Sequence, residues 1–254
     1  MLSEHDGQVW TVAFSPDGRL LASIGADSIR LWEVASGSVV QELASGQSTR
    51  LTSLAFSPDG ETVAAGSENG AVNLWSVKTG QPKEPLRWHV GSVHAVAFSP
   101  DRRWLASGGD DKTVQLIDRA TGQRSHRFRT GTSVNRLSFS PDSQSLAAAS
   151  DSSGPSVRLW DLATKTERAV TSHTQAVVSV AFHPAGDRIA SASEDGTVQL
   201  RDAFTSDDPG SVFDFHQIGP CRNVAFSPSG RHLAVGLGDG SIAILRTSPR
   251  TAPR

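Results

Sequence analysis

The heptapeptide VAFSPDG spans Val12–Gly18, and close variants of it recur along the chain. The variants are LAFSPDG from Leu54, VAFSPDR from Val96, LSFSPDS from Leu137, VAFHPAG from Val180 and VAFSPSG from Val224. The phenylalanines at Phe14, Phe56, Phe98, Phe139, Phe182 and Phe226 are separated by 42, 42, 41, 43 and 44 residues. This regular spacing indicates one structural unit that is repeated six times.

The residues around each heptapeptide are typical of short strands joined by tight turns. Each repeat contains runs rich in valine, isoleucine, leucine and tryptophan, separated by glycine, proline, aspartate or serine. In Ser15-Pro16-Asp17-Gly18, proline suits the second turn position and glycine suits the fourth, so we predict a hairpin turn between two strands. Arg102 and Ser143 replace this glycine in two copies, so those turns are either strained or different in geometry.

The first strand of each repeat alternates small and large residues. In the first copy, Trp10, Val12 and Phe14 share one face, and Ala13 lies on the other. The residue before the phenylalanine is alanine or serine in all six copies. A small face opposite a large one favours sheets that stack side by side and taper toward an axis.

The repeat resembles the WD40 repeat in four features. These are a period of roughly 40–45 residues, a histidine before the first strand, the FSPDG turn, and a later strand such as SIRLWE at Ser28–Glu33. The resemblance covers Leu2–Arg246 and implies an all-β, WD40-type β-propeller with six recognisable blades of antiparallel strands. We therefore expect a propeller domain at residues 1–246 and a disordered tail at residues 247–254.

The same resemblance implies a buried hydrogen-bond relay that runs from tryptophan through serine to histidine and an acid. The sequence keeps this relay only in part, most fully in the first copy, where Asp27 is the expected acid. The matching residues are His5, His89 and His173, then Ser23, Ser107 and Ser191, and then Trp32, Trp75 and Trp160. Because these histidines belong to different blades, we favour the relay over a metal site.

The sixth repeat lacks a clear fourth strand. Its end reads TSPRTAPR, and only Met1–Glu4 precede His5 at the other end of the chain. We therefore expect the last blade to lack its outer strand, and the chain to be either a segment of a longer protein or an open ring. Ser241–Arg246 would then be an apolar edge that can accept a strand from elsewhere.

The composition argues against several classes of partner and of chemistry. The formal net charge is −2, which disfavours nucleic-acid and membrane partners. Cys221 is the single cysteine and no leader sequence is evident, so we predict a cytoplasmic protein. No motif for catalysis, phosphate binding or metal binding is present, so we expect no enzyme activity, no cofactor, no metal and no small-molecule ligand.

Function is predicted to lie on one face of the propeller. The resemblance implies a non-catalytic scaffold that binds a protein or peptide where loops from several blades converge on its top face. The candidate partner-binding residues are Trp10, Arg50, His94, Asp110, Asn135, Glu194 and Arg222. Trp10 alternatively packs between blades. The alternative function is a sensory or regulatory repeat segment of a larger NTPase or protein kinase. The arginine-rich stretch Arg119–Arg129 is either a solvated outer strand or a salt-sensitive docking patch.

Overall fold

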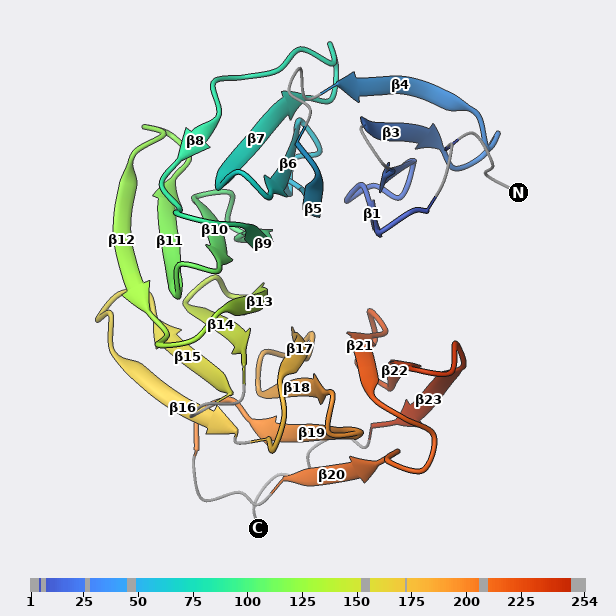
Figure 1. Cartoon of the computed structure of the whole chain (residues 1–254), viewed down its shortest axis with the longest axis vertical. Coiled ribbons are helices and arrows are strands. Elements are labelled where there is room, and N and C mark those ends of the chain that lie inside the picture. The colour runs from blue at the N-terminus through green and yellow to red at the C-terminus, as the bar shows by residue number, and fades with distance from the viewer. Residues whose placement is uncertain are drawn as a thin grey trace. The chain divides into compact units, whose positions relative to one another are not determined.

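The computed structural model describes residues 5, 8–25, 28–44, 49–151, 156–171, 173–205 and 210–247, and these residues form antiparallel strands without a helix (Figure 1). The chain forms two compact units, Met1–Val134 and Asn135–Arg254. Together the described residues make six sheets of three or four strands, numbered below as blades 1 to 6 in chain order. The predicted all-β repeat architecture is confirmed.

Within its described residues, the first unit holds three blades of four strands. Blade 1 consists of β1 (Thr11–Phe14), β2 (Leu20–Ile24), β3 (Ser28–Glu33) and β4 (Val39–Ala44). Blade 2 consists of β5 (Leu51–Phe56), β6 (Thr62–Ser67), β7 (Ala71–Ser76) and β8 (Leu86–Arg87). Blade 3 consists of β9 (Val93–Phe98), β10 (Trp104–Gly109), β11 (Thr113–Asp118) and β12 (Arg124–Arg129).

The second unit holds the other three described blades. The first strand of blade 4 begins at Val134, which is the last residue of the first unit. Blade 4 consists of β13 (Val134–Phe139), β14 (Ser145–Ser150), β15 (Val157–Asp161) and β16 (Glu167–Thr171). Blade 5 consists of β17 (Val177–Phe182), β18 (Arg188–Ser193), β19 (Thr197–Asp202) and β20 (Ser211–Asp214). Blade 6 consists of β21 (Cys221–Phe226), β22 (His232–Leu237) and β23 (Ile242–Arg246).

Strand β23 lies at the edge of blade 6 among the described residues. It begins at Ile242, one residue later than predicted, and Ile242 and Ile244 are 69% and 62% exposed. Thr247, the first residue of the expected tail, is buried, and its N–H donates to the Arg231 carbonyl at 2.9 Å. The rest of that tail lies outside the described residues, and acceptance of a further strand stays a prediction.

The core of each unit lies between blades. One apolar cluster joins blades 1 and 2 and includes Ile29 and Trp75, and another joins blades 2 and 3 and includes Val93 and Leu105. The second strand of a blade is rich in small residues because the next blade approaches it closely. At Gly66, for example, a Cβ atom would lie 2.6 Å from the Val93 carbonyl oxygen of blade 3.

The face of blade 1 that carries Val12 and Phe14 is more exposed than the same face of blades 2 and 3. Val12 and Phe14 of β1 are exposed, whereas Leu54 of blade 2 and Val96 of blade 3 are buried at the position of Val12. In the first unit, blade 2 packs on blade 1 and blade 3 packs on blade 2, but no blade of that unit precedes blade 1. Val12 and Phe14 are therefore not covered by another blade of that unit among the described residues.

The Ser-Pro-Asp-Gly turn joins the first two strands of a blade through side-chain hydrogen bonds. The Gly18 N–H donates to the Ser15 carbonyl at 2.9 Å, and the Leu20 N–H donates to Ser15 Oγ at 2.9 Å. Asp17 Oδ1 accepts from Ser15 Oγ at 2.6 Å and from the Arg19 N–H at 3.0 Å. These bonds lower the pKa of Asp17, with the serine hydroxyl as the largest cause and the Arg19 N–H as the next.

The fourth turn position has a left-handed backbone whether or not glycine occupies it. Gly18 has a φ of 70°, and Arg102 and Ser143 have φ values of 69° and 61° at the same position. The two non-glycine turns therefore keep the common geometry and are strained, which decides between the two alternatives that the sequence allowed.

The Ser-Pro-Asp-Gly turn of blade 2, which includes Asp59, also makes a contact with blade 3. Asp59 Oδ2 lies 3.1 Å from Arg119 Nη2, and both side chains are mostly buried. Burial alone would raise the pKa of Asp59, but the Ser57 hydroxyl, the Glu61 N–H and the Arg119 guanidinium outweigh it and lower the pKa from 3.8 to about 2. The carboxylate form therefore stabilises the folded state.

We predict that Arg102→Gly stabilises the protein, because glycine adopts this left-handed conformation without strain. The expected gain is about 1 kcal/mol, or roughly 2–4 °C in melting temperature. The reverse change, Gly18→Arg, should lower the melting temperature by a similar amount, since a Cβ atom there meets nothing within 4 Å and adds strain alone. Equal melting temperatures for all three proteins would contradict the assignment of strain.

Asp59→Asn is predicted to lower the free energy of unfolding by roughly 2 kcal/mol at pH 7. Because the folded-state pKa is below the unfolded value of 3.8, the contribution of Asp59 is present above about pH 4 and is lost as the pH falls to about 2. Urea unfolding between pH 2 and 7 measures this, and the variant should lose less stability than the wild type below pH 4.

Asp17→Asn is the matched control for that measurement. Asp17 makes the same turn bonds but is exposed, and its one ion pair, with Arg19, is 3.9 Å long. An effect of Asp17→Asn as large as that of Asp59→Asn would show that the inter-blade contact with Arg119 contributes nothing.

Candidate protein-binding surface

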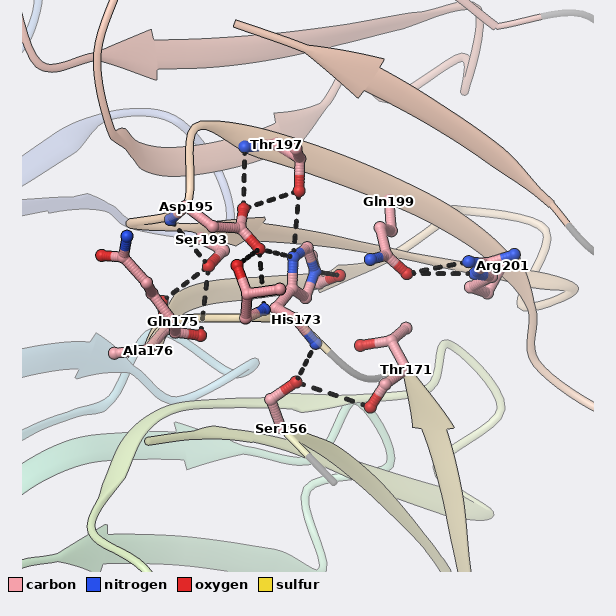
Figure 2. Close-up of polar contacts among 12 residues, drawn as sticks. Ser156, Thr171, His173, Gln175, Ala176, Ser193, Asp195, Thr197, Gln199 and Arg201 are labelled. Atoms are coloured by element: carbon pink, nitrogen blue, oxygen red, sulfur yellow. Dashed lines mark hydrogen bonds and ion pairs between the residues drawn. The ribbon is translucent and has the colours of Figure 1, made fainter. Parts of the chain in front are cut away.

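The loops before the first strand of a blade and the turns between its second and third strands are tied together by the histidine relay. In blade 5, His173 Nδ1 donates to Asp195 Oδ2 at 3.1 Å, and His173 Nε2 accepts from Ser191 Oγ at 2.8 Å. The His173 backbone N–H also donates to Ser156 Oγ of blade 4 at 2.8 Å. Figure 2 shows His173 between Asp195 and Ser156. The His173 side chain thus bonds within blade 5, and its backbone N–H connects this loop to blade 4 of the same unit.

His173 is neutral in this setting. Burial lowers its pKa below the ordinary value, although the charge and hydrogen bond of Asp195 oppose the shift. For Asp195, burial alone would raise the pKa, but the hydrogen bonds from Thr197 and from the Thr174 N–H lower it. A neutral histidine that donates to a carboxylate suits a structural relay.

Blades 1 and 3 contain different members of the relay. In blade 1, Trp32 Nε1 donates to Ser23 Oγ at 2.7 Å, and Ser23 Oγ lies 2.7 Å from His5 Nε2. The expected acid of this blade, Asp27, lies outside the described residues. In blade 3, His89 bonds to Ser107 at 2.8 Å and to Asp111 at 3.0 Å, while isoleucine occupies the tryptophan position.

The described residues contain no group of three or more histidine, cysteine, aspartate or glutamate side chains that could hold a metal ion. His5, His89 and His173 bond instead to serines of their own blades, as the relay interpretation predicts.

Trp10, Arg50 and Glu68 form an exposed cluster at the ends of blades 1 and 2. The Trp10 N–H donates to the Ile24 carbonyl at 3.0 Å, which places the residue just before β1. The Arg50 guanidinium lies 3.9 Å from the centroid of the Trp10 ring, and its Nη1 lies 3.5 Å from Glu68 Oε1. Trp10 remains 41% exposed, so it does not simply pack between blades.

His94 and Asp110 form a second pair in the first unit, on blade 3. His94 Nε2 lies 2.7 Å from Asp110 Oδ1, and both side chains are accessible to solvent. Burial alone would raise the pKa of Asp110, but the hydrogen bond and charge of His94, together with the Ser92 N–H, lower it. Asp110 is followed directly by Asp111 of the relay, so the relay also fixes the position of this pair.

The second unit brings its candidate residues into two separate pairs. Arg222 Nη1 of blade 6 lies 2.8 Å from Glu194 Oε1 of blade 5, and both side chains are more than one-third exposed. Asn135 Nδ2 donates to Asp151 Oδ1 at 3.1 Å and to the Val177 carbonyl of blade 5 at 3.0 Å. Asn135 therefore braces two blades in addition to bordering the surface.

Backbone hydrogen bonds explain why these residues meet. The N–H groups of Glu68, Asp110 and Glu194 donate to the carbonyls of Arg50, Ser92 and Ala176 at 2.9–3.0 Å. Each acid lies twelve residues after the phenylalanine of its repeat, and each carbonyl lies six residues before it. Asp151 also lies twelve residues after its phenylalanine, so this spacing could have identified it, although it was not among the predicted residues.

All seven predicted residues thus lie at the strand ends or loops expected for them, in pairs or clusters within each unit. Their convergence around one common opening stays a prediction. Glu68 and Asp151 complete the set as partners of Arg50 and Asn135.

Two further groups singled out in the sequence carry no evident chemistry. Cys221 is buried on β21, and burial together with the charges of Asp195 and Asp214 raises its thiol pKa to about 11. The arginine-rich stretch covers the turn before β12 and β12 itself, at the edge of blade 3. Arg119 at its start pairs with Asp59, and a docking role for the exposed arginines of β12 stays a prediction.

Within the described residues, no helix has the length and apolar character that crossing a membrane would require.

Comparison with known families gives two matches along the chain. The model of the IFT122 first β-propeller matches residues 50–219. The model of the WD domain, G-beta repeat, matches residues 1–33 and 208–244. The two matches overlap at residues 208–219 and together cover residues 1–33 and 50–244 of the same run of repeats.

Three curated relatives illustrate the range of similar proteins. Protein tipD of Dictyostelium discoideum is 29% identical over 94% of this chain and 40% of its own length. The periodic tryptophan protein 2 homolog of the same organism is 30% identical over 80% of this chain and 22% of its own length. The guanine nucleotide-binding protein subunit beta of Oryza sativa subsp. indica is 29% identical over 97% of this chain and 70% of its own length. The chain therefore spans less than half of tipD and of the periodic tryptophan protein.

Ser23→Ala is predicted to destabilise the protein by about 1–3 kcal/mol, because it leaves the buried Trp32 indole N–H without its acceptor and removes the bond to His5. Denaturant unfolding measures the change. Ser36→Ala is the matched control: Ser36 is exposed in the turn after β3, and its loss should change stability by less than about 0.5 kcal/mol. Equal effects would show that the relay does not stabilise blade 1.

Proposed function

Because the chain belongs to the WD40-repeat β-propeller family, we propose that it is a non-catalytic scaffold that binds a protein or peptide through the loop ends of its blades. One of its relatives is a subunit of a guanine nucleotide-binding protein, as its name states, which supports a role in a protein assembly. The family alone does not select a partner or a surface. The exposed side chains at the loop ends favour one surface.

The cluster of Trp10, Arg50 and Glu68 carries this proposal. Tryptophan and arginine are the residue types that most often dominate protein interfaces, and here both are exposed and held in one fixed arrangement. The stacked guanidinium restricts the tryptophan before a partner arrives, so less conformational entropy is lost on binding. An exposed, ordered tryptophan has little value for the stability of the free protein and suits an anchor residue.

The other pairs offer further charges and hydrogen-bonding groups at the loop ends of their own units. His94 and Asp110 lie on the neighbouring blade 3 of the same unit, and Arg222 and Glu194 form an accessible ion pair in the second unit. Exposed ion pairs contribute little to folding, so their charges remain available to orient a partner. The role of a repeat segment in a larger NTPase or kinase, and the cytoplasmic location, stay predictions.

The test is affinity capture with the tagged protein, comparing Trp10→Ala and Arg50→Ala with the wild type by quantitative mass spectrometry. Loss of an anchor residue is expected to cost about 2 kcal/mol, so the shared bound proteins should decrease by roughly 30-fold. Arg127→Ala is the matched control, because Arg127 is an exposed arginine on the outer strand β12 and should leave capture unchanged.

Thermal unfolding of each variant establishes that it is folded before capture is compared. If the same proteins are captured equally by folded Trp10→Ala and Arg50→Ala variants, the proposed surface is wrong. If they are lost with Arg127→Ala instead, the edge of blade 3 is the binding surface.

A further inference from the structure

The outer strand of blade 2 is interrupted. β8 has two residues, whereas β4 and β12 of the neighbouring blades have six each. The preceding segment pairs with β7 at the bridge between Trp75 and Pro82, and the pairing resumes between Val72 and Leu86. The outer chain thus advances four residues while β7 advances three. The same shift occurs at the same position in blades 1 and 3, so blade 2 differs from them in the short length of its outer strand.

Proline explains the interruption. Pro82 and Pro85 have no backbone N–H, so neither can donate to β7, and outer strands are where sheets tolerate proline. The outer strand of blade 2 is therefore reduced to the two residues of β8, and Lys83 and Glu84 before it lie beside residues of blade 3.

Blade 3 has a smaller side chain than usual at the same interface. Leu105 pairs with Ile117 in the register in which Val63 pairs with Trp75 and Leu21 pairs with Trp32. Trp75 packs in the cluster shared with the preceding blade 1, and Ile117 packs in the cluster shared with the preceding blade 2. The change from tryptophan to isoleucine therefore leaves unfilled space between blades 2 and 3.

A cavity of about 450 Å³ lies where these two changes meet. Its apolar surface comes from Leu86, Phe98, Leu105 and Ile117, and its polar border includes Lys83 and Arg119. A second cavity of about 300 Å³ borders the same segment and shares Leu74, Lys83 and Glu84 with the first. The larger volume is in the range of small-molecule sites, and all of its lining residues belong to the first unit.

One cation in the lining of the cavity, Lys83, can accept an anionic head group. Lys83 Nζ donates to Thr62 Oγ1 at 3.1 Å and has no carboxylate partner among the described residues. The Arg119 guanidinium lies 5.0 Å from the centroid of the Phe98 ring and is held in place by Asp59. Glu84 is the one acid in the lining, and Arg119 is already paired with Asp59, so Lys83 is the cation of the lining that has no carboxylate partner among the described residues. An unpaired ammonium beside an apolar cavity can bind a carboxylate.

We propose that this cavity binds an amphipathic monocarboxylate, with its hydrocarbon part against Phe98, Leu105 and Ile117 and its carboxylate at Lys83. The proposal is separate from the scaffold function, because Trp10 and Arg50 do not line the cavity. It also departs from the sequence-based expectation that the protein has no small-molecule ligand.

Titration calorimetry of the full chain with decanoate tests the proposal, with decanol and decylamine as matched probes of the same chain length. Decanoate should bind at least 10-fold more tightly than the other two. Lys83→Met should bring decanoate to the affinity of decanol. Lys78→Met, in the exposed turn of the same blade and outside the cavity lining, should leave binding unchanged.

Ile117→Trp tests the location. The larger side chain fills the cavity, and its indole N–H can donate to Ser107 Oγ as Trp32 donates to Ser23 in blade 1. This variant should raise the melting temperature and reduce decanoate binding at least 10-fold. Leu86→Trp at the border of the cavity provides a second blocking variant if the first does not fold.

Three results would overturn the proposal. They are equal affinity for decanoate, decanol and decylamine, tighter binding of decylamine than of decanoate, and unchanged decanoate binding by a folded blocking variant.

Discussion

The sheets of this protein have apolar residues on both faces, so each blade depends on its neighbour for burial. Four apolar clusters of the described residues support this dependence: they join blades 1 and 2, 2 and 3, 4 and 5, and 5 and 6. Side chains between two blades of one unit are buried. Val12 of blade 1 and Ile244 of blade 6 are exposed, although each lies at a repeat position that is buried in most blades with a neighbour there. The small residues of the second strands and the fixed turns both serve this close stacking.

The repeat pattern predicted the blades well because their turns and strands depend on local chemistry. Pro16 and Gly18 suit the turn by their backbone preferences alone, and the alternation in the first strand shows its two faces. The acid of the turn was not assigned a role, although Asp17 and Asp59 accept the bonds that hold it together. The sequence alone does not show whether the turn at Arg102 keeps the left-handed backbone, because this depends on whether the hydrogen bonds of the turn outweigh the backbone strain.

The sequence predicts where the residues of the candidate surface lie along each repeat, but not which of them contact one another. Counting from the phenylalanines identified Arg50, His94 and Arg222, because strand ends recur at fixed distances along the repeat. The stacking of Arg50 on Trp10 and the ion pair of Arg222 with Glu194 connect different blades, so they depend on tertiary packing. The cavity beside Lys83 likewise depends on tertiary packing, since it forms where the short outer strand of blade 2 meets Ile117 of blade 3.

Cys221 also follows from the stacking of blades. Its thiol is fully buried at the start of β21, in the cluster that blades 5 and 6 share, and its raised pKa keeps it protonated at neutral pH. It is the single cysteine of the chain, so a thiol-specific reagent has one target. The rate at which a reagent labels this thiol in the native chain therefore reports how often blades 5 and 6 separate.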